Sequence, residues 1–176
     1  MKFNSFTDKN IQNERKNDNT WVAFYDPLKL AERIVGGREL AFVNFYCTRP
    51  PTRLLHEDER HKRIYKNTNA YYAAIEKLPN VFVKYGVLNG VNGTLTEKNL
   101  DTQLTTDMIT GAALGTYDVA VLISNDGDYV SAVTGVKRFG KKVETIFFRG
   151  CFSMNLRKVS DLTRRARKSF FEFLRF

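Results

Sequence analysis

Apolar and polar positions along this chain alternate between two patterns, one typical of buried strands and one typical of amphipathic helices. Short runs rich in apolar and β-branched residues predict strands near 40–47, 80–88, 118–124 and 142–149. Apolar residues at helical spacing predict helices near 27–36, 55–78, 99–115, 128–139 and 161–174. Because strands and helices alternate, the chain is predicted to adopt an α/β fold with a mainly parallel sheet and right-handed crossovers.

Two of these helices have clear boundary residues. Asp26 precedes Pro27 at the start of the first helix, where an aspartate caps free backbone N–H groups and proline suits the first turn. Leu78 precedes Pro79, which ends the long second helix because the residue before a proline avoids the helical region. After the second strand, Asn89–Gly93 is predicted to form a flexible turn.

The most informative run is the strand Val119–Ile123 with the segment Ser124-Asn125-Asp126-Gly127-Asp128 that follows it. Two carboxylates therefore lie at the carboxyl end of a buried strand, where open α/β sheets place their ligand sites. Two aspartates so close repel each other, and a hard cation such as Mg²⁺ or Mn²⁺ relieves that repulsion. The same residues also suit an ordinary turn in which Asp126 caps the next helix. The buried strand and a second acidic segment upstream favour the metal-binding interpretation.

That second acidic segment is the start of the predicted helix 99–115. Asp101 lies in its first turn, and Asp107 follows six residues later, about 120° around the helix axis. The two acids therefore do not lie on one narrow stripe of the helix surface. Both would still border the same cleft if the helix crosses that cleft obliquely. The alternative for Asp101 is a favourable interaction with the helix dipole, and for Asp107 a solvated polar position.

Taken together, K-N-L-D-x5-D at 98–107 and S-N-D-G-D-Y at 124–129 resemble the motifs of the NYN domain of the PIN-like nuclease superfamily. The corresponding family motifs are approximately K-G-V-D-x5-D and S-G-D-G-D-F. The resemblance extends over nearly the whole chain. It implies a Rossmann-like, three-layer fold over residues 1–160, followed by a basic, aromatic C-terminal helix at 161–176. It also implies an acidic cluster that binds Mg²⁺ or Mn²⁺ and the hydrolysis of phosphodiester bonds, usually in RNA.

The resemblance further implies roles for individual residues. The catalytic acids are expected to be Asp101, Asp107, Asp126 and Asp128, and the metal ligands among them Asp101, Asp126 and Asp128. The residues expected to shape the site or contact the nucleic acid are Asn4, Lys98, Ser124 and Asn125. Lys98 suits either contact with the nucleic acid or support of a nearby acid.

The start of the chain departs from the family pattern. Family members open with a buried strand ending in Asp-Gly-Phe-Asn, and that aspartate is a metal ligand. Here Phe3-Asn4 resembles the end of this motif, which puts Met1 in the position of the acid and leaves the first strand absent. We therefore expect marginal folding or direct pairing of strands 40–47 and 118–124, a weak metal site, and little nuclease activity unless a strand ending in Asp is added upstream.

A different register would make Trp21–Tyr25 the first strand and Asp26 the missing acid. We disfavour this register because Asp26-Pro27 is typical of a helix start. It would also remove the loop that must connect the strand to the helix.

The formal net charge of +9 is unevenly distributed. Residues 149–176 contain eight basic and two acidic residues, and a second basic group at 53–66 is interleaved with Tyr65, Tyr71 and Tyr72. This favours a polyanionic partner, with single-stranded RNA preferred because aromatic rings stack on unpaired bases. The alternative is an ordinary solvated surface. The phenylalanines near the C-terminus favour docking of the last helix on the body or on a second subunit, and an anionic membrane surface is the other possibility.

The remaining composition indicates a compact single domain. The chain has 176 residues, and its sequence contains neither a membrane span nor the apolar run of a signal peptide. Cys47 and Cys151 have no metal-ligand spacing and favour reduced thiols in a cytoplasmic protein. The predicted function is a metal-dependent ribonuclease. The alternatives are a non-catalytic RNA-binding module and a phosphatase-like, metal-dependent enzyme acting on a small substrate.

Overall fold

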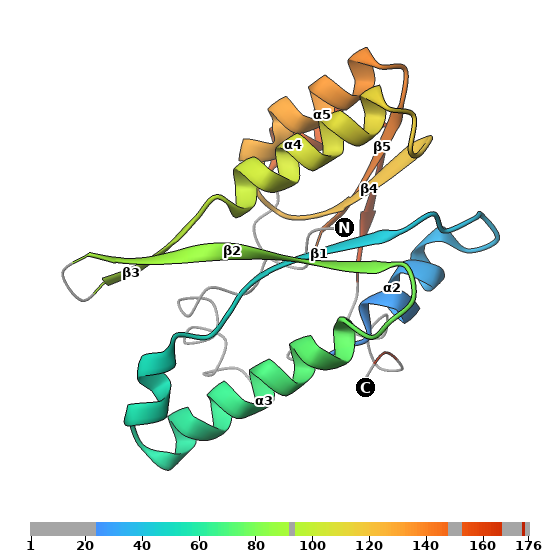
Figure 1. The fold of residues 1–176 in the computed structure, drawn as a ribbon. Coiled ribbons are helices and arrows are strands. Elements are labelled where there is room, and N and C mark those ends of the chain that lie inside the picture. The colour runs from blue at the N-terminus through green and yellow to red at the C-terminus, as the bar shows by residue number, and fades with distance from the viewer. Residues whose placement is uncertain (1–23, 92–93, 148–152, 167–173, 175–176) are drawn as a thin grey trace.

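The computed structural model describes residues 24–91, 94–147, 153–166 and 174, which form an alternating series of helices and strands (Figure 1). The helices are α2 (Pro27–Val35), α3 (Glu59–Ile75), α4 (Leu100–Ala113), α5 (Val130–Arg138) and α6 (Met154–Val159), with short 3-10 helices η2 (Thr52–His56) and η3 (Gly127–Tyr129). The strands are β1 (Val43–Thr48), β2 (Val81–Val91), β3 (Thr94–Lys98), β4 (Val119–Ile123), β5 (Lys142–Phe147) and β6 (Leu162–Arg165).

The strands form two groups of three. In the first group, β1 pairs in parallel with β2, and β2 pairs antiparallel with β3. In the second group, β5 lies between β4 and β6, and all three are parallel. Within the described residues no ladder joins β1 to β4. The expected direct pairing of strands 40–47 and 118–124 is therefore wrong for this part of the chain.

The two groups nevertheless belong to one layered structure. A core that includes residues of α2, α3 and β1 covers one face, and a core that includes residues of α4, α5 and α6 covers the other (Figure 1). Both β1 and β4 contribute to both cores, because Phe45 and Ile123 belong to the first and Tyr46 and Leu122 to the second. Since successive residues of a strand point to opposite faces, the two groups lie as halves of one central layer. This confirms the predicted three-layer α/β fold.

The helix boundary at Asp26 follows the sequence prediction. The Oδ1 atom of Asp26 accepts hydrogen bonds from the amides of Leu28 at 2.9 Å and Lys29 at 3.1 Å, and Pro27 occupies the first helical turn. This aspartate is 5% exposed and caps α2. Asp26 is therefore a helix-capping residue, and not the metal-binding acid that the register with Trp21–Tyr25 as the first strand would require.

A charged cluster fastens the loop after α2 to the second strand group. Arg38 donates two hydrogen bonds to Glu144 of β5, at 2.7 and 3.1 Å, and Arg164 of β6 donates another to the same carboxylate. Burial opposes ionisation of Glu144, but the hydrogen bonds from the two guanidinium groups outweigh it and lower its pKa. The cluster thus holds an ionised carboxylate between the two halves of the fold.

Three elements differ from the sequence prediction. The helix expected over 55–78 begins as η2 and restarts as α3, because Asp58 caps a new helix by accepting from the amide of His61. Of the turn expected at 89–93, residues 89–91 instead belong to a long β2 that pairs with an unpredicted β3, and residues 92–93 lie outside the described residues. The helix expected over 161–174 is wrong at its start, because Leu162–Arg165 pair with the free edge of β5 as β6. Most of its remainder lies outside the described residues.

No helix in the described ranges combines the length and the apolar character needed to cross a membrane. Cys47 is buried on β1.

Candidate functional site

The acidic loop, Ser124–Asp128, is organised by its own side chains at the carboxyl end of β4. Ser124 is 2% exposed, and its Oγ accepts a hydrogen bond from the Asp126 amide at 3.1 Å. Asp126 Oδ1 accepts from the Asp128 amide at 2.9 Å and so caps η3. The capping role predicted for Asp126 is therefore present, and within the described residues no hydrogen bond to its second oxygen is recorded. The carboxylate of Asp128 is exposed.

The start of α6 packs tightly against the acidic loop. The Ser153 amide donates to the Asn125 carbonyl at 3.2 Å. A Cβ atom on Gly127 would lie 2.7 Å from Ser153 Oγ, which is closer than real Cβ contacts. This close approach favours glycine at position 127, because a larger residue would force Ser153 to shift. The backbone of the loop is consequently held between β4 and α6.

Asp101 lies beside the acidic loop. The hydroxyl of Tyr129, which follows Asp128 directly, donates a hydrogen bond to Asp101 Oδ1. Tyr129 is 1% exposed, whereas Asp101 is exposed at the start of α4. Asn99, in the left-handed conformation with φ of 74°, turns the chain from β3 into this helix. The two acidic motifs of the sequence therefore meet at one edge of the sheet.

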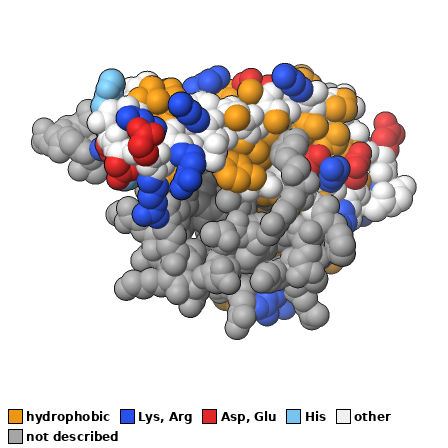
Figure 2. All heavy atoms as spheres, turned by 90° about the horizontal axis from the view of Figure 1, so that it is seen from below, with side chains coloured by type: hydrophobic (Ala, Val, Ile, Leu, Met, Phe, Trp, Pro, Cys, Tyr) orange, Lys and Arg blue, Asp and Glu red, His pale blue; other side chains and the backbone are white. Residues whose placement is uncertain are grey.

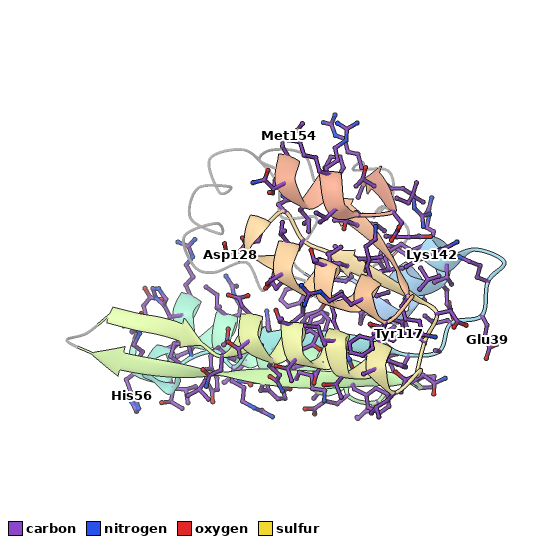
Figure 3. All side chains as sticks on the ribbon, turned by 90° about the horizontal axis from the view of Figure 1, so that it is seen from above. Glu39, His56, Tyr117, Asp128, Lys142 and Met154 are labelled. Atoms are coloured by element: carbon purple, nitrogen blue, oxygen red, sulfur yellow. The ribbon has the colours of Figure 1, made fainter. Side chains whose placement is uncertain are left out.

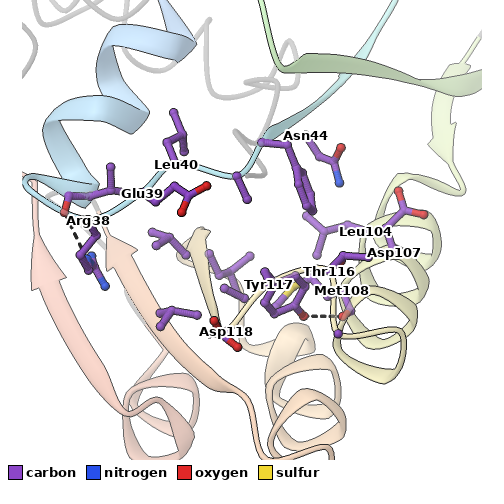
Figure 4. Close-up of a pocket in the computed structure, with 18 of the residues that line it drawn as sticks. Arg38, Glu39, Leu40, Asn44, Leu104, Asp107, Met108, Thr116, Tyr117 and Asp118 are labelled. Carbon is purple, nitrogen blue, oxygen red and sulfur yellow. Dashed lines mark hydrogen bonds between the residues drawn. The ribbon is translucent and has the colours of Figure 1, made fainter.

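Asp107 lies farther along α4 and faces a different neighbourhood. Its Oδ2 accepts a hydrogen bond from the Tyr46 hydroxyl at 2.8 Å and lies 3.8 Å from Lys84 Nζ. Burial, together with the hydrogen bond to Asp107, raises the pKa of Tyr46. Asp107 also lines a cavity between β1 and β4 that extends to Tyr117, at the far end of α4 (Figure 4). The structure thus brings Asp101 to the loop and anchors Asp107 to β1 and β2.

A comparison with known families agrees with this arrangement, because the model of the NYN domain matches residues 9–165. The chain belongs to the NYN domain family. The match includes both acidic motifs and every described helix and strand of Figure 1. The NYN domain places this protein in the PIN-like nuclease superfamily, as the sequence motifs predicted.

Solved structures support the fold alone. This NYN domain is similar to the crystal structure of a protein of unknown function from Vibrio parahaemolyticus, with a TM-score of 0.58 and 17% identity over 91% of this chain and 87% of that one. A second match is the crystal structure of a polyphosphate kinase from Porphyromonas gingivalis, with a TM-score of 0.25 and 10% identity over 81% of this chain and 35% of that one. This similarity is too weak to support any conclusion. The search of the curated proteins gave no match.

The carboxylates suit a hydrated divalent ion better than a closed cage. Within the described ranges no three Asp, Glu, His or Cys side chains are grouped closely enough to hold a metal ion by themselves. Mg²⁺ usually keeps several waters and is bound by one or two carboxylates together with substrate phosphates. Asp101, Asp126 and Asp128 offer carboxylate oxygens of the preferred type at one edge of this NYN domain. The donor set therefore fits such an ion.

Two of the predicted substrate-binding residues lie partly or wholly outside the described structure. Lys98 is the last residue of β3 and immediately precedes the turn into α4, but its side chain lies outside the described part of the structure. Asn4 lies outside the described residues altogether. Tyr129 was not among the predicted site residues. Its position in S-N-D-G-D-Y could have revealed it, because the family motif has phenylalanine there and Tyr129 adds a hydroxyl beside the acids.

The predicted basic group at 53–66 is partly neutralised. Lys62 pairs with Glu59 at 2.7 Å, and His61 lies 2.8 Å from Asp58. Figure 2 shows the molecule from below relative to Figure 1. On this face, Lys and Arg side chains are scattered, with acidic side chains beside several of them. The last turn of α6 carries Arg157 and Lys158, which are both exposed.

Proposed function

We propose that this NYN domain hydrolyses phosphodiester bonds of single-stranded RNA at the acidic loop with the help of Mg²⁺ or Mn²⁺. The observation that carries the proposal is the hydrogen bond from Tyr129 to Asp101. It ties the two acidic motifs to one edge of the sheet, at the carboxyl ends of parallel strands. Ligand sites of open α/β folds lie at this edge.

The residues at this edge have separable roles in the proposal. Asp101, Asp126 and Asp128 would hold the ion, which when bound orients a water molecule and stabilises negative charge on the phosphate. Tyr129 holds the Asp101 carboxylate in place, and Ser124 fixes the backbone turn that presents Asp126. Asn125 and Lys98 would contact phosphate oxygens, and Asp107 stays at the margin with Tyr46.

We expect residues 1–176 to cleave RNA slowly, because carboxylates that form no three-ligand group within the described residues hold a divalent ion weakly without substrate phosphates. The test is cleavage of a 5′-labelled, single-stranded RNA in Mg²⁺ and in Mn²⁺ by the wild type and by Asp126→Asn. The substitution should lower the rate at least about 100-fold, since it removes a ligand rather than a residue that supports one.

Asp118→Asn is the matched control for this experiment. Asp118 precedes β4 at its amino end, is 94% exposed and pairs with Lys141 at 2.7 Å. The control should cleave at the wild-type rate. Cleavage by Asp126→Asn at the wild-type rate, or the absence of metal-dependent cleavage at high protein concentration, would contradict the proposed nuclease activity.

The second candidate function is RNA binding without catalysis. It is favoured by the lack of a three-ligand group among the described residues. In that case RNA would bind with a salt-dependent affinity, yet neither Mg²⁺ nor Mn²⁺ would produce Asp126-dependent cleavage.

A further inference from the structure

Arg49, the first residue after β1, holds its guanidinium group over an aromatic ring. The Cζ atom of Arg49 lies 4.0 Å from the centre of the Tyr85 ring, well within the range of a cation–π contact. One guanidinium nitrogen lies 3.7 Å from Glu76 Oε1, and the Tyr85 hydroxyl donates a hydrogen bond to the same oxygen at 2.8 Å. The three side chains therefore hold one another in place at the end of β1.

The ring under this guanidinium is part of the packed interior. Tyr85 of β2 packs against the core that contains residues of α2, α3 and β1. Its ring centre lies 6.0 Å from that of Tyr72, in an edge-to-face arrangement, and Tyr72 donates a hydrogen bond to the Thr48 carbonyl at 3.2 Å. The support for Arg49 is thus fixed by α3 and by the last residue of β1.

Arg49 itself is open to solvent. Its side chain is 61% exposed, and that of Glu76 is 45% exposed. An ion pair so exposed contributes little to stability, so the fold gains little from holding this arginine. The result is a planar cation supported on one side by a ring and accessible on the other. Proteins stack unpaired RNA bases on such guanidinium planes.

The end of β1 meets the start of α4 at Gly86. A Cβ atom on Gly86 would lie 2.6 Å from a side-chain carbon of Leu100 and 3.2 Å from one of Thr48. Arg49 follows Thr48 directly, and Asp101 follows Leu100. Arg49 and the predicted metal ligand Asp101 are therefore each one residue away from side chains that pack around the same glycine.

Figure 3 shows the same relation at the scale of the molecule. His56, in η2 shortly after Arg49, and Asp128 of the acidic loop lie toward the end where β2 and β3 extend, and Tyr117 lies toward the other end (Figure 3). The segment that follows β1 and the acidic loop that follows β4 therefore share one end of the molecule.

Arg49 and Asp101 reach this end from opposite faces of the sheet. Tyr85, under Arg49, packs in the core with α2 and α3, whereas Leu100, before Asp101, packs in the core with α4 and α5. An RNA strand that contacts both Arg49 and the acidic loop therefore crosses the carboxyl edge of the sheet.

We propose that Arg49 stacks on a base of single-stranded RNA whose backbone reaches the acidic loop, an inference that rests on the proposed function. The Tyr85 ring supports the guanidinium group on one side, and the base covers the open side. Such stacking tolerates any sequence, because every base has a π-face. Arg49 is thus a positioning residue that holds the strand without reading it.

A contact with a phosphate is the competing role for this arginine. A phosphate contact requires a positive charge, which lysine also supplies, whereas stacking requires the planar guanidinium group. The Glu76 carboxylate beside Arg49 offsets part of its charge and repels phosphate. This favours stacking.

The test compares binding of two chains of equal length and charge, oligo(U) and the same sugar–phosphate chain without bases. Binding is measured with the full protein in EDTA, so that no cleavage intervenes. The wild type should prefer oligo(U). Arg49→Lys keeps the charge and loses the plane, so it should reduce this preference at least about fivefold, the scale of one base stack. Its salt dependence should equal that of the wild type.

Arg138→Lys is the matched control, because Arg138 is exposed in the last turn of α5, shortly before β5 begins. It should keep the wild-type preference. Tyr85→Phe retains the ring and should also keep it, whereas Tyr85→Leu removes the support and should lower the preference as Arg49→Lys does. If Tyr85→Leu does not fold, Arg49→Lys still decides the question.

Equal preference for oligo(U) in Arg49→Lys and in the wild type would overturn the proposal. Wild-type binding that does not distinguish the two chains would overturn it as well. Neither result would affect the nuclease proposal, which the cleavage assay tests separately. Conversely, a preference for bases that depends on Arg49 would support stacking even if no RNA is cleaved.

Discussion

At the scale of single residues, the candidate site depends on a few hydrogen bonds that place carboxylates rather than on a preformed cluster. Sequence alone predicts Asp126 and Asp128 at a strand end and Asp101 at a helix start, because both positions follow from local apolar patterns. It does not predict that Tyr129 bonds to Asp101, since that contact depends on how α4 and η3 pack. Nor does it predict that Tyr46 and Lys84 anchor Asp107.

Tyr129→Phe removes the hydroxyl that bonds to Asp101 and keeps the buried ring, so its effect reports on the hydrogen bond alone. The loss of one hydrogen bond to a carboxylate should lower the free energy of unfolding by about 1 kcal/mol. Because Asp101 loses its support, Mn²⁺ affinity should fall about tenfold, as measured by isothermal titration calorimetry. Tyr117→Phe is the control, because the Tyr117 hydroxyl donates to the Met108 carbonyl and touches no candidate ligand. Unchanged Mn²⁺ affinity in Tyr129→Phe would remove Tyr129 from the site.

At the scale of helices and strands, the sequence predicts those elements whose end residues are typical of a helix or strand boundary. Asp26 and Pro27 mark the start of α2 in the sequence and in the structure. The segment Leu162–Arg165 lacks such a signal, and its conformation is decided by the free edge of β5. The hairpin of β2 and β3 was missed for a similar reason, because pairing with a partner strand overrides the turn tendency of a glycine-rich segment.

Gly127→Ala is predicted to strain the contact between the acidic loop and α6. Ser153 Oγ, 2.7 Å from the added Cβ, also caps α6 through the Leu156 amide and has little freedom to move. Overpacking of this kind should cost about 1–3 kcal/mol in urea unfolding. Gly37→Ala is the matched control, because nothing lies within 4 Å of its added Cβ. It should change the stability by no more than about 0.5 kcal/mol. Equal stability of the two variants would show that the loop is not held against α6.

At the scale of the whole molecule, the positive charge is less available than the formal total of +9 suggests. Arg38 and Arg164 are bound to Glu144, and Lys62 is paired with Glu59. Such pairing depends on tertiary contacts, so a count of charges along the sequence overestimates the surface open to RNA. Arg157 and Lys158, in the last turn of α6, are exposed and form no ion pair within the described residues, so they are candidates for backbone contacts.

Charge reversal on α6 is predicted to weaken RNA binding. Arg157→Glu and Lys158→Glu should each lower affinity for single-stranded RNA of any sequence. Each should also reduce the slope of log K against log salt by about 0.7, the share of one phosphate contact. Lys29→Glu is the control, because Lys29 is exposed on α2, and α2 packs in the other core from α6. Filter binding across a salt series measures both quantities, and equal slopes in all three variants would leave α6 as ordinary surface.

The most direct test of the central claim is binding of Mn²⁺ followed by NMR, because a paramagnetic ion broadens only the signals of nearby amides. The account predicts broadening confined to the start of α4 and to the acidic loop, around Asp101 and residues 124–129, with loss of the effect in Asp126→Asn and retention in Asp118→Asn. Broadening that lies elsewhere, or that persists unchanged in Asp126→Asn, would contradict a metal site at the carboxyl end of β4.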